Sequence, residues 1–293
     1  MKAKDKVYNL INILFFGIAG IWFFRDFHDI AGIFDETEPM LLLIILCTVI
    51  LVHLTKACRL YLALYGTENT LDAWEYLKIY CKVTPVGMLL PFKTGELFRI
   101  YCYGRQLNSI LNGMVVVLLD RFMDTIAVLT LIVVMWIFDG GQLAFLTYAL
   151  FIFLVFLIFL YYAVPGVCYF WKKYLLRVKA SERRLWGLRT IEVFWVLYGE
   201  IENVVKGRGI ILYLLSLLAW VIEIGSLVIV GRISISGNTS TAISDYLTSA
   251  MNGTMSDEFR EFVFISVTGL VLLYFILWIA DLAARKRWVH RWK

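Results

Sequence analysis

The feature that most constrains this chain is a series of six apolar runs. They extend over Val7–Phe24, Met40–Tyr65, Asn108–Phe138, Leu143–Val164, Gly209–Gly231 and Phe259–Leu282. About 20 mostly apolar residues are enough for a helix to cross a bilayer, whereas outer-membrane barrels alternate in strands of about ten residues. Charged residues make up only 17% of the chain, and the mean hydropathy is +0.77. The sequence therefore predicts an all-α, polytopic membrane helix bundle of about six spanning helices, with residues 1–293 as a single integral membrane domain.

The charges between these runs predict the orientation of the bundle. Residues 25–39 hold one base and five acids, and residues 232–258 are mainly polar and uncharged. In contrast, residues 166–208 hold nine bases against four acids, and the tail from Arg285 to Lys293 is strongly basic. Because basic loops stay on the cytoplasmic side, we expect loop 166–208 and both termini to be cytoplasmic and loop 232–258 to be external. The modest net charge of +5 reports this orientation and gives no indication of nucleic-acid binding.

A shorter apolar stretch near residue 90 is interrupted by residues that disturb a helix. Pro85 and Pro91 each remove a backbone donor, and Gly87 and Gly95 relax the backbone. Irregular backbone survives at membrane depth only where protein or a wet cavity covers it. We therefore expect a re-entrant broken-helix segment around residues 83–95. Before it, residues 70–82 are typical of an amphipathic interfacial helix or of an ordinary connector helix, with a helix start at Asp72.

Ionisable residues gather around this interruption and in the apolar run that follows. They are Lys93, Glu96, Arg99, Asp120, Arg121 and Asp124, and their formal charges cancel. Helical spacing places Glu96 and Arg99 on one face, and Asp120 and Asp124 on another. Charges inside a membrane are costly and are functional-site hypotheses by default. We expect Glu96, Arg99, Asp120, Arg121 and Asp124 to form one network. The alternative is a group of charges that reach out to the membrane surface.

Two further ionisable residues lie within apolar runs. Glu223 is in the middle of the fifth run, so we expect it to face the interior of the bundle. His53, in the second run, is expected to be a packed or hydrogen-bonded residue and not a ligand. The sequence shows no nucleophile beside a base, no cluster of metal ligands and no phosphate-binding loop. It predicts neither an enzyme nor a protein with a metal or a cofactor.

The residues from Pro91 to Arg99, followed by Asp120-Arg121-Phe122-Met123-Asp124, resemble the lysylphosphatidylglycerol synthase transmembrane family, whose members include flippase-like domains. The shared pattern is a proline, a base, Gly-Glu and an arginine, then an acid-Arg-x-x-Asp motif about twenty residues later. Here Pro91, Lys93, Gly95, Glu96 and Arg99 match its first part, and Asp120, Arg121 and Asp124 match its second. Trp220 and Glu223 resemble a weaker family feature. The resemblance does not extend to an aminoacyl-transferase domain, so aminoacylation of a lipid is not implied.

The resemblance implies a flippase-like protein of the cell membrane that handles a lipid with a charged headgroup in cell-envelope biogenesis. The lipid would be an anionic phospholipid or a polyprenyl-phosphate-linked sugar. Lys93, Arg99 and Arg121 can pair with phosphate, and arginine can do so bidentately. We expect these three bases to line a cavity that opens toward the cytoplasmic leaflet. Glu96, Asp120 and Asp124 would hold the bases when the site is empty, and Glu223 could face the same cavity. The alternative is a non-catalytic membrane partner of a glycosyltransferase or polysaccharide assembly system.

Overall fold

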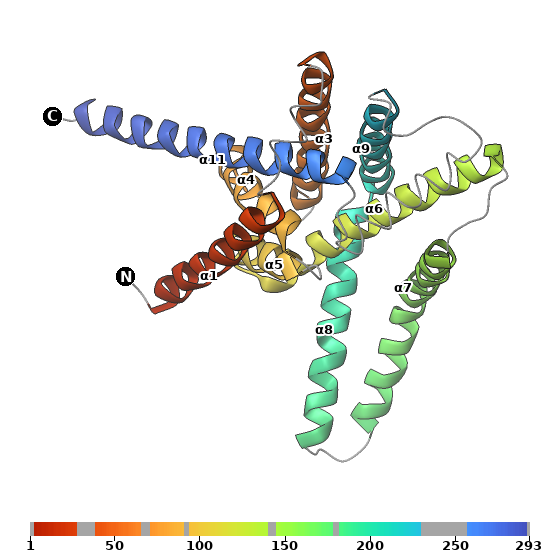
Figure 1. The fold of residues 1–293 in the computed structure, drawn as a ribbon. Helices are drawn as coiled ribbons and strands as arrows, with labels where there is room; N and C mark the ends of the chain where they lie inside the picture. The colour runs from red at the N-terminus through yellow and green to blue at the C-terminus, as the bar shows by residue number, and fades with distance from the viewer. Residues whose placement is uncertain are drawn as a thin grey trace.

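The computed structural model describes residues 3–27, 39–65, 71–90, 94–139, 145–177, 182–229 and 257–291. Within these ranges the chain is helical apart from short connections, which agrees with the predicted all-α bundle (Figure 1). The helices are α1 (Ala3–Asp26), α3 (Pro39–Tyr65), α4 (Ala73–Leu89), α5 (Thr94–Gln106), α6 (Ile110–Asp139), α7 (Phe145–Arg177), α8 (Glu182–Val205), α9 (Gly209–Ile229) and α11 (Asp257–Arg291).

Five of the helices in the described ranges are long and apolar enough to cross a membrane. They are α1, α3, α7, α9 and α11, which correspond to the first, second, fourth, fifth and sixth predicted spans. The chain is therefore a multi-pass membrane protein. The third predicted span became α6, which has 30 residues but is not among the five. It carries Asp120, Arg121 and Asp124 in its first half, and its role as a sixth span stays a prediction.

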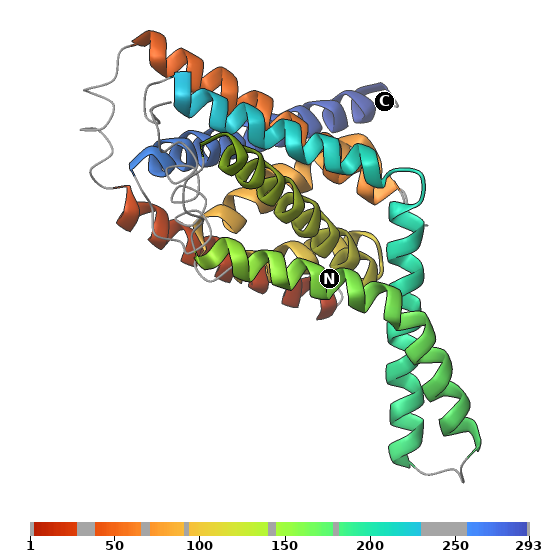
Figure 2. The ribbon, with the colours of Figure 1, turned by 90° about the vertical axis from the view of Figure 1, so that its right-hand side faces the viewer.

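Apart from α8 and the second half of α7, the long helices share a common direction, which runs from left to right in Figure 2. The two chain termini, the end of α3 and the start of α9 lie at the same end of the bundle (Figure 2). The charge pattern predicts a cytoplasmic location for the two termini and for the loop that leads into α9. The arrangement is compatible with that topology, but the side of the membrane itself stays a prediction.

The predicted re-entrant segment is a hairpin of two helices, α4 and α5. The break lies after Leu90, whose extended backbone (φ −80°, ψ 130°) is what a residue before a proline prefers. Pro85 and Gly87, which we expected at the break, lie inside α4, which continues to Leu89. A single proline costs one backbone hydrogen bond and need not end a helix whose remaining bonds are intact. As predicted, α4 starts at Asp72, whose carboxylate accepts a hydrogen bond from the backbone amide of Trp74 at 3.2 Å.

Two glycine contacts bring α5 close to its neighbours. A Cβ atom on Gly95 would lie 2.4 Å from the Cα atom of Gly87, so α4 and α5 touch backbone to backbone. A Cβ atom on Gly113 would likewise lie 2.4 Å from the backbone nitrogen of Gly104, where α6 meets α5. Small residues at such contacts are the usual device for close helix approach in membranes. Gly87 lies inside α4 and Gly95 lies in the first turn of α5, next to the break, and both serve helix packing.

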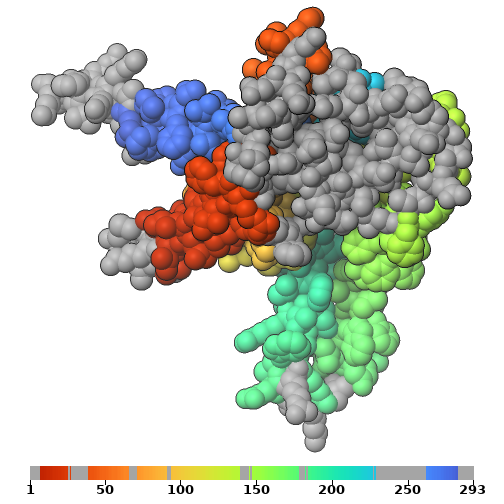
Figure 3. All heavy atoms as spheres, in the orientation of Figure 1, coloured from red at the N-terminus to blue at the C-terminus, as the bar shows by residue number. Residues whose placement is uncertain are grey.

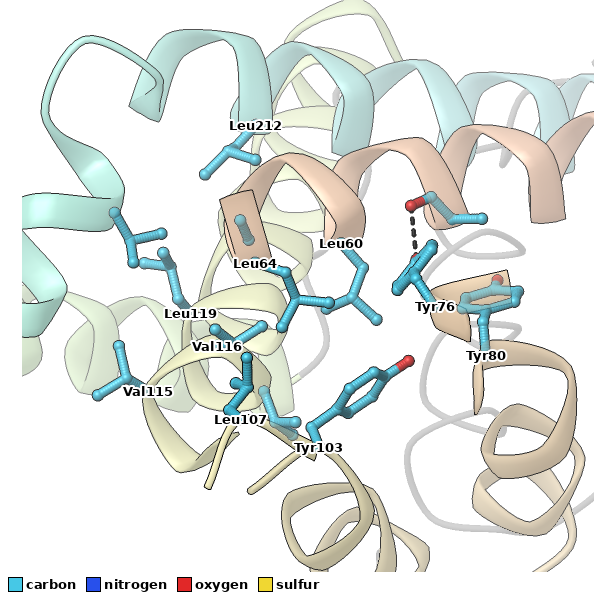
Figure 4. Packing of buried hydrophobic residues seen from close by; sticks show 14 of the residues in the cluster. Leu60, Leu64, Tyr76, Tyr80, Tyr103, Leu107, Val115, Val116, Leu119 and Leu212 are labelled. Atoms are coloured by element: carbon cyan, nitrogen blue, oxygen red, sulfur yellow. Dashed lines mark hydrogen bonds between the residues drawn. The ribbon is translucent and has the colours of Figure 1, made fainter. Parts of the chain in front are cut away.

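A buried cluster joins α3, α4, α5, α6 and α9 next to the charged residues. Its centre includes Leu60, Leu64, Tyr76, Tyr103 and Val116, all of which are almost fully enclosed (Figure 4). The hydroxyl of Tyr76 donates a hydrogen bond of 2.6 Å to the carbonyl oxygen of Ala57, which ties α4 to α3. This cluster fixes the relative positions of the helices that carry the ionisable network.

Helix α7 is longer than the predicted fourth span. It contains Pro165 and continues to Arg177, so the first part of the predicted basic loop is a direct extension of a span. The helix bends along its length and then runs across the common direction of the bundle, with α8 packed beside it (Figure 2). A proline inside a helix is a usual cause of such a kink.

Candidate functional site

Arg59, on α3, is at the centre of a buried ionic network. Its Nε donates to Oδ1 of Asp120 at 2.9 Å and its Nη2 to the same oxygen at 2.5 Å. Its Nη1 pairs with Asp124 and also donates to the hydroxyl of Ser216, on α9, at 2.5 Å. Asp120 and Asp124 are one helical turn apart on α6, so one guanidinium reaches both. Arg59 is only 2% exposed, and it joins α3, α6 and α9 through charge-assisted hydrogen bonds.

Arg99, on α5, is the second buried cation of the network. Its Nη1 donates to Oε2 of Glu96 at 3.1 Å, and its Nη2 donates to Oδ2 of Asp120 at 3.3 Å. The side chain also lies against Gly87, since a Cβ atom there would be 3.5 Å from Cδ of Arg99. The Nε atom is buried without a hydrogen-bond partner among the described residues. Arg99 therefore links the helical hairpin to α6.

Arg121, on α6, is the exposed cation of the network. Its Nε lies 2.8 Å from Oε1 of Glu96, and its Nη1 lies 3.7 Å from Oδ2 of Asp124. Its side chain is 48% exposed, compared with 3% for Arg59 and 5% for Arg99. Glu96 is thus shared between a buried arginine on one side and an accessible arginine on the other. An anion that approaches from outside the protein would meet Arg121 first.

The charges of this network balance. Three arginines, Arg59, Arg99 and Arg121, face the three carboxylates of Glu96, Asp120 and Asp124. An isolated charge taken out of water costs several kcal/mol, so a buried group of this size is tolerated only if its members pair with one another. The pairing therefore explains how α5 and α6 can carry charge in a chain that is otherwise so apolar.

A second ion pair joins α3 to α9 one helical turn away from Arg59. Nζ of Lys56 lies 3.0 Å from Oε2 of Glu223, whose side chain is 3% exposed. The same ammonium lies 5.1 Å from the ring centroid of Trp220, within the range of a cation–π contact. Another turn along α3, Nδ1 of His53 lies 3.2 Å from the hydroxyl of Tyr80. Three polar side chains thus lie at successive turns of α3: His53 contacts α4, Lys56 contacts α9, and Arg59 contacts both α6 and α9.

The structure brings together the five residues for which the sequence predicts a network. Glu223 faces the bundle interior, as expected, but pairs with Lys56 and has no ion pair with the arginines of the network among the described contacts. Arg99 is buried and occupied by two carboxylates, so its predicted position at the wall of an open cavity stays a prediction. Lys93 and Pro91 lie outside the described residues. Arg59 was not predicted from the sequence, because a base near the end of a span also fits an ordinary topology signal.

Comparison with known proteins gives one family match. A sequence model of the family described as the lysylphosphatidylglycerol synthase TM region matches residues 9–255. The match covers every helix of the network. No curated protein and no solved structure gives a significant match to the chain.

Proposed function

Because this chain belongs to the family of the lysylphosphatidylglycerol synthase TM region, we propose that it binds a membrane lipid with a charged headgroup and moves that headgroup across the bilayer. The lipid is an anionic phospholipid or a polyprenyl-phosphate-linked sugar, and the membrane is the cell membrane. The observation that carries the proposal is Arg121, an accessible cation at the edge of a buried, charge-balanced network. The proposal includes no covalent step and no cofactor.

In this proposal the phosphate of the headgroup binds by exchanging ion pairs. A phosphate oxygen replaces Glu96 as the partner of Arg121, and a guanidinium can hold a phosphate through two parallel hydrogen bonds. Glu96 is not left as a lone charge, because Nη1 of Arg99 already lies 3.1 Å from its carboxylate. The exchange therefore avoids the cost of an isolated buried carboxylate.

The remaining members of the network would hold their positions during this exchange. A headgroup that leaves water must find fixed protein partners, since the desolvation cost would otherwise stop it. Arg59 holds Asp120 and Asp124 in place from α3, and neither carboxylate has to move when Glu96 is released. Arg99, behind Glu96, is the next cation that the headgroup would meet.

The direct test is transport in liposomes by the full-length protein. A fluorescent anionic phospholipid, or a marked polyprenyl phosphate, is followed as it passes from one leaflet to the other. Arg121→Gln should lower the rate about 10- to 100-fold, which is the value of one charge-assisted interaction of about 1.5–3 kcal/mol. Arg25→Gln is the matched control, because it removes the same charge from the last turn of α1. A wild-type rate equal to that of empty liposomes for every lipid class would refute the translocator proposal.

The second candidate is a non-catalytic partner of a glycosyltransferase or polysaccharide assembly system. The burial of Arg59 and Arg99 favours it, because a structural role in holding the helices together is enough to explain a buried, charge-balanced network. In that case Arg121→Gln and Arg25→Gln would behave alike in liposomes. A membrane glycosyltransferase would instead co-purify with the wild-type chain.

A further inference from the structure

The second half of α7 and the first half of α8 form a hairpin that leaves the bundle. It runs across the common direction of the long helices at the end where both chain termini lie (Figure 2), and it protrudes from the body of the molecule (Figure 3). Helix α7 has 33 residues, which is about 50 Å at 1.5 Å per residue, whereas the hydrocarbon is about 30 Å thick. Its last turns therefore exceed what a straight crossing needs, and the bend turns them across the common direction of the bundle (Figure 2).

The two helices of the hairpin enclose an apolar groove of about 540 Å³. This volume lies within the range of roughly 300–1,000 Å³ that is usual for small-molecule sites. Its walls include Val164, Cys168 and Trp171 from α7 and Trp186, Ile191 and Phe194 from α8. Trp186 remains 73% exposed and Phe194 54% exposed, so the groove opens to the surroundings of the hairpin. Such a lining suits a hydrocarbon chain.

The hairpin carries an excess of basic residues, which lie on both of its helices. The acids of the hairpin, Glu182 and Glu192, are outnumbered by its bases. The bases are Lys172, Lys173 and Arg177 on α7, with Arg184 and Arg189 on α8. Lys172 directly follows Trp171, and Arg189 directly precedes Thr190, both of which line the groove. Nζ of Lys173 lies 6.0 Å from the ring centroid of Tyr169. Interleaved aromatic and basic residues are typical of helices that lie in a membrane interface and attract anionic lipids.

We propose that this hairpin lies in the plane of one leaflet and binds an anionic phospholipid, with an acyl chain in the α7–α8 groove. The phosphate pairs with basic residues of the hairpin, among them Lys172 and Arg189. An anionic phospholipid fits because it combines a hydrocarbon chain with a negative headgroup, and the hairpin combines an apolar groove with an excess of positive charge on the two helices that form it. The proposal does not depend on transport, because a bound lipid could anchor the hairpin whether or not the ionic network moves a headgroup.

The test uses the full-length protein in vesicles of defined composition. The native cysteines are replaced, and Val193→Cys, at an exposed position on α8, carries an environment-sensitive dye. Two series of vesicles contain chain-brominated lipid at the same set of increasing mole fractions, with phosphatidylglycerol brominated in one series and phosphatidylcholine in the other. We expect quenching of the dye by brominated phosphatidylglycerol at a lower mole fraction than by brominated phosphatidylcholine.

Three variants test which feature causes this preference. Lys172→Glu with Arg189→Glu should lower the preference for phosphatidylglycerol at least about fivefold, which is the contribution of one basic residue near an anionic surface. Thr190→Phe, which places a ring in the groove, should weaken quenching by the anionic lipid. Arg105→Glu, on α5, is a charge reversal away from the hairpin and should leave the preference unchanged.

Several outcomes would overturn the proposal. Equal quenching by the two lipids, or a preference that survives the double charge reversal, would mean that the groove does not select an anionic lipid. An absence of quenching by either lipid would place the hairpin outside the bilayer. A dye signal that follows the protein-to-lipid ratio and ignores the brominated lipid would identify a second copy of this chain as the occupant. Transport assays are not part of this readout, so failure here leaves the proposed function of the ionic network standing.

Discussion

Replacing Arg59 by methionine tests whether the ionic network holds the bundle together. The substitution keeps a long unbranched side chain but removes every hydrogen bond that the guanidinium donates to Asp120, Asp124 and Ser216. The six-residue network then carries three carboxylates and two cations. The remaining ion-pair partner of Asp120 is Arg99, at 3.3 Å. The remaining partner of Asp124 is Arg121, at 3.7 Å.

The size of the effect follows from burial. Removing one partner of a buried ion pair costs about 3–5 kcal/mol, because the remaining charge stays in a medium of low polarity. At about 1.4 kcal/mol for a factor of ten, the unfolding equilibrium constant rises by roughly two to four orders of magnitude. Arg121 is half exposed, so its loss should cost only about 0–1 kcal/mol of stability. The loss of stability on replacing Arg59 should therefore be much larger than the loss on replacing Arg121.

Reversible unfolding in mixed detergent micelles, followed by circular dichroism, measures this difference. The double variant Arg59→Met with Asp124→Leu restores charge balance, and it should recover part of the loss caused by Arg59→Met alone. The coupling energy of this double-mutant cycle should exceed about 1 kcal/mol, whereas independent sites add within about 0.5 kcal/mol. Additive losses, or a loss for Arg59→Met no larger than for Arg121→Gln, would refute the argument that the network is a buried structural unit.

Three further predictions concern helix contacts and topology. Gly95→Ala should lower the thermal midpoint markedly, because its Cβ would lie 2.4 Å from Gly87 Cα, whereas Gly225→Ala, with open space around it, should keep or raise the midpoint. Lys56→Met should destabilise the protein by about 1.5–3 kcal/mol, which is the value of a hydrogen bond to a charged group. Adding Glu223→Gln should recover part of this loss, as measured by chemical unfolding. Single cysteines at positions 180 and 290 should resist an impermeant reagent added outside cells, and one at position 240 should react; strong labelling at 180 or 290 would overturn the predicted topology.

The fold class follows from sequence because membrane insertion leaves few choices. A long apolar run must satisfy its backbone hydrogen bonds internally, so it becomes a helix. The same argument cannot locate a helix end when a proline falls within a run of good helix formers. Pro85 lies inside α4 and Pro165 inside α7, although the sequence suggested a break at each. Neighbouring helices can compensate for one missing backbone bond, and a single sequence does not reveal those neighbours.

The candidate site was predictable only where its members are close in the chain. Glu96 and Arg99, or Asp120 and Asp124, are related by helical spacing, so their shared faces can be read from the sequence. Arg59 lies 61 residues before Asp120, and the pairing of Lys56 with Glu223 spans 167 residues. Near the end of a span a base also fits the rule that positive charge stays inside. Only the packing of α3 against α6 and α9 distinguishes a buried hub from such a signal.

The position of Arg59 changes how Lys93 contributes to the charge balance. The three arginines already neutralise the three carboxylates, so a seventh member, Lys93, would give the site one positive charge in excess. A site with one excess positive charge is matched by a phosphodiester headgroup with one negative charge. Lys93→Gln should therefore weaken binding of phosphatidylglycerol to the purified protein about tenfold while the unfolding transition stays unchanged. Arg59→Met, in contrast, should mainly lower the stability of the protein. If Lys93→Gln destabilised the protein as much as Arg59→Met, Lys93 would be a structural member of the network, and the excess charge would not exist to attract a lipid.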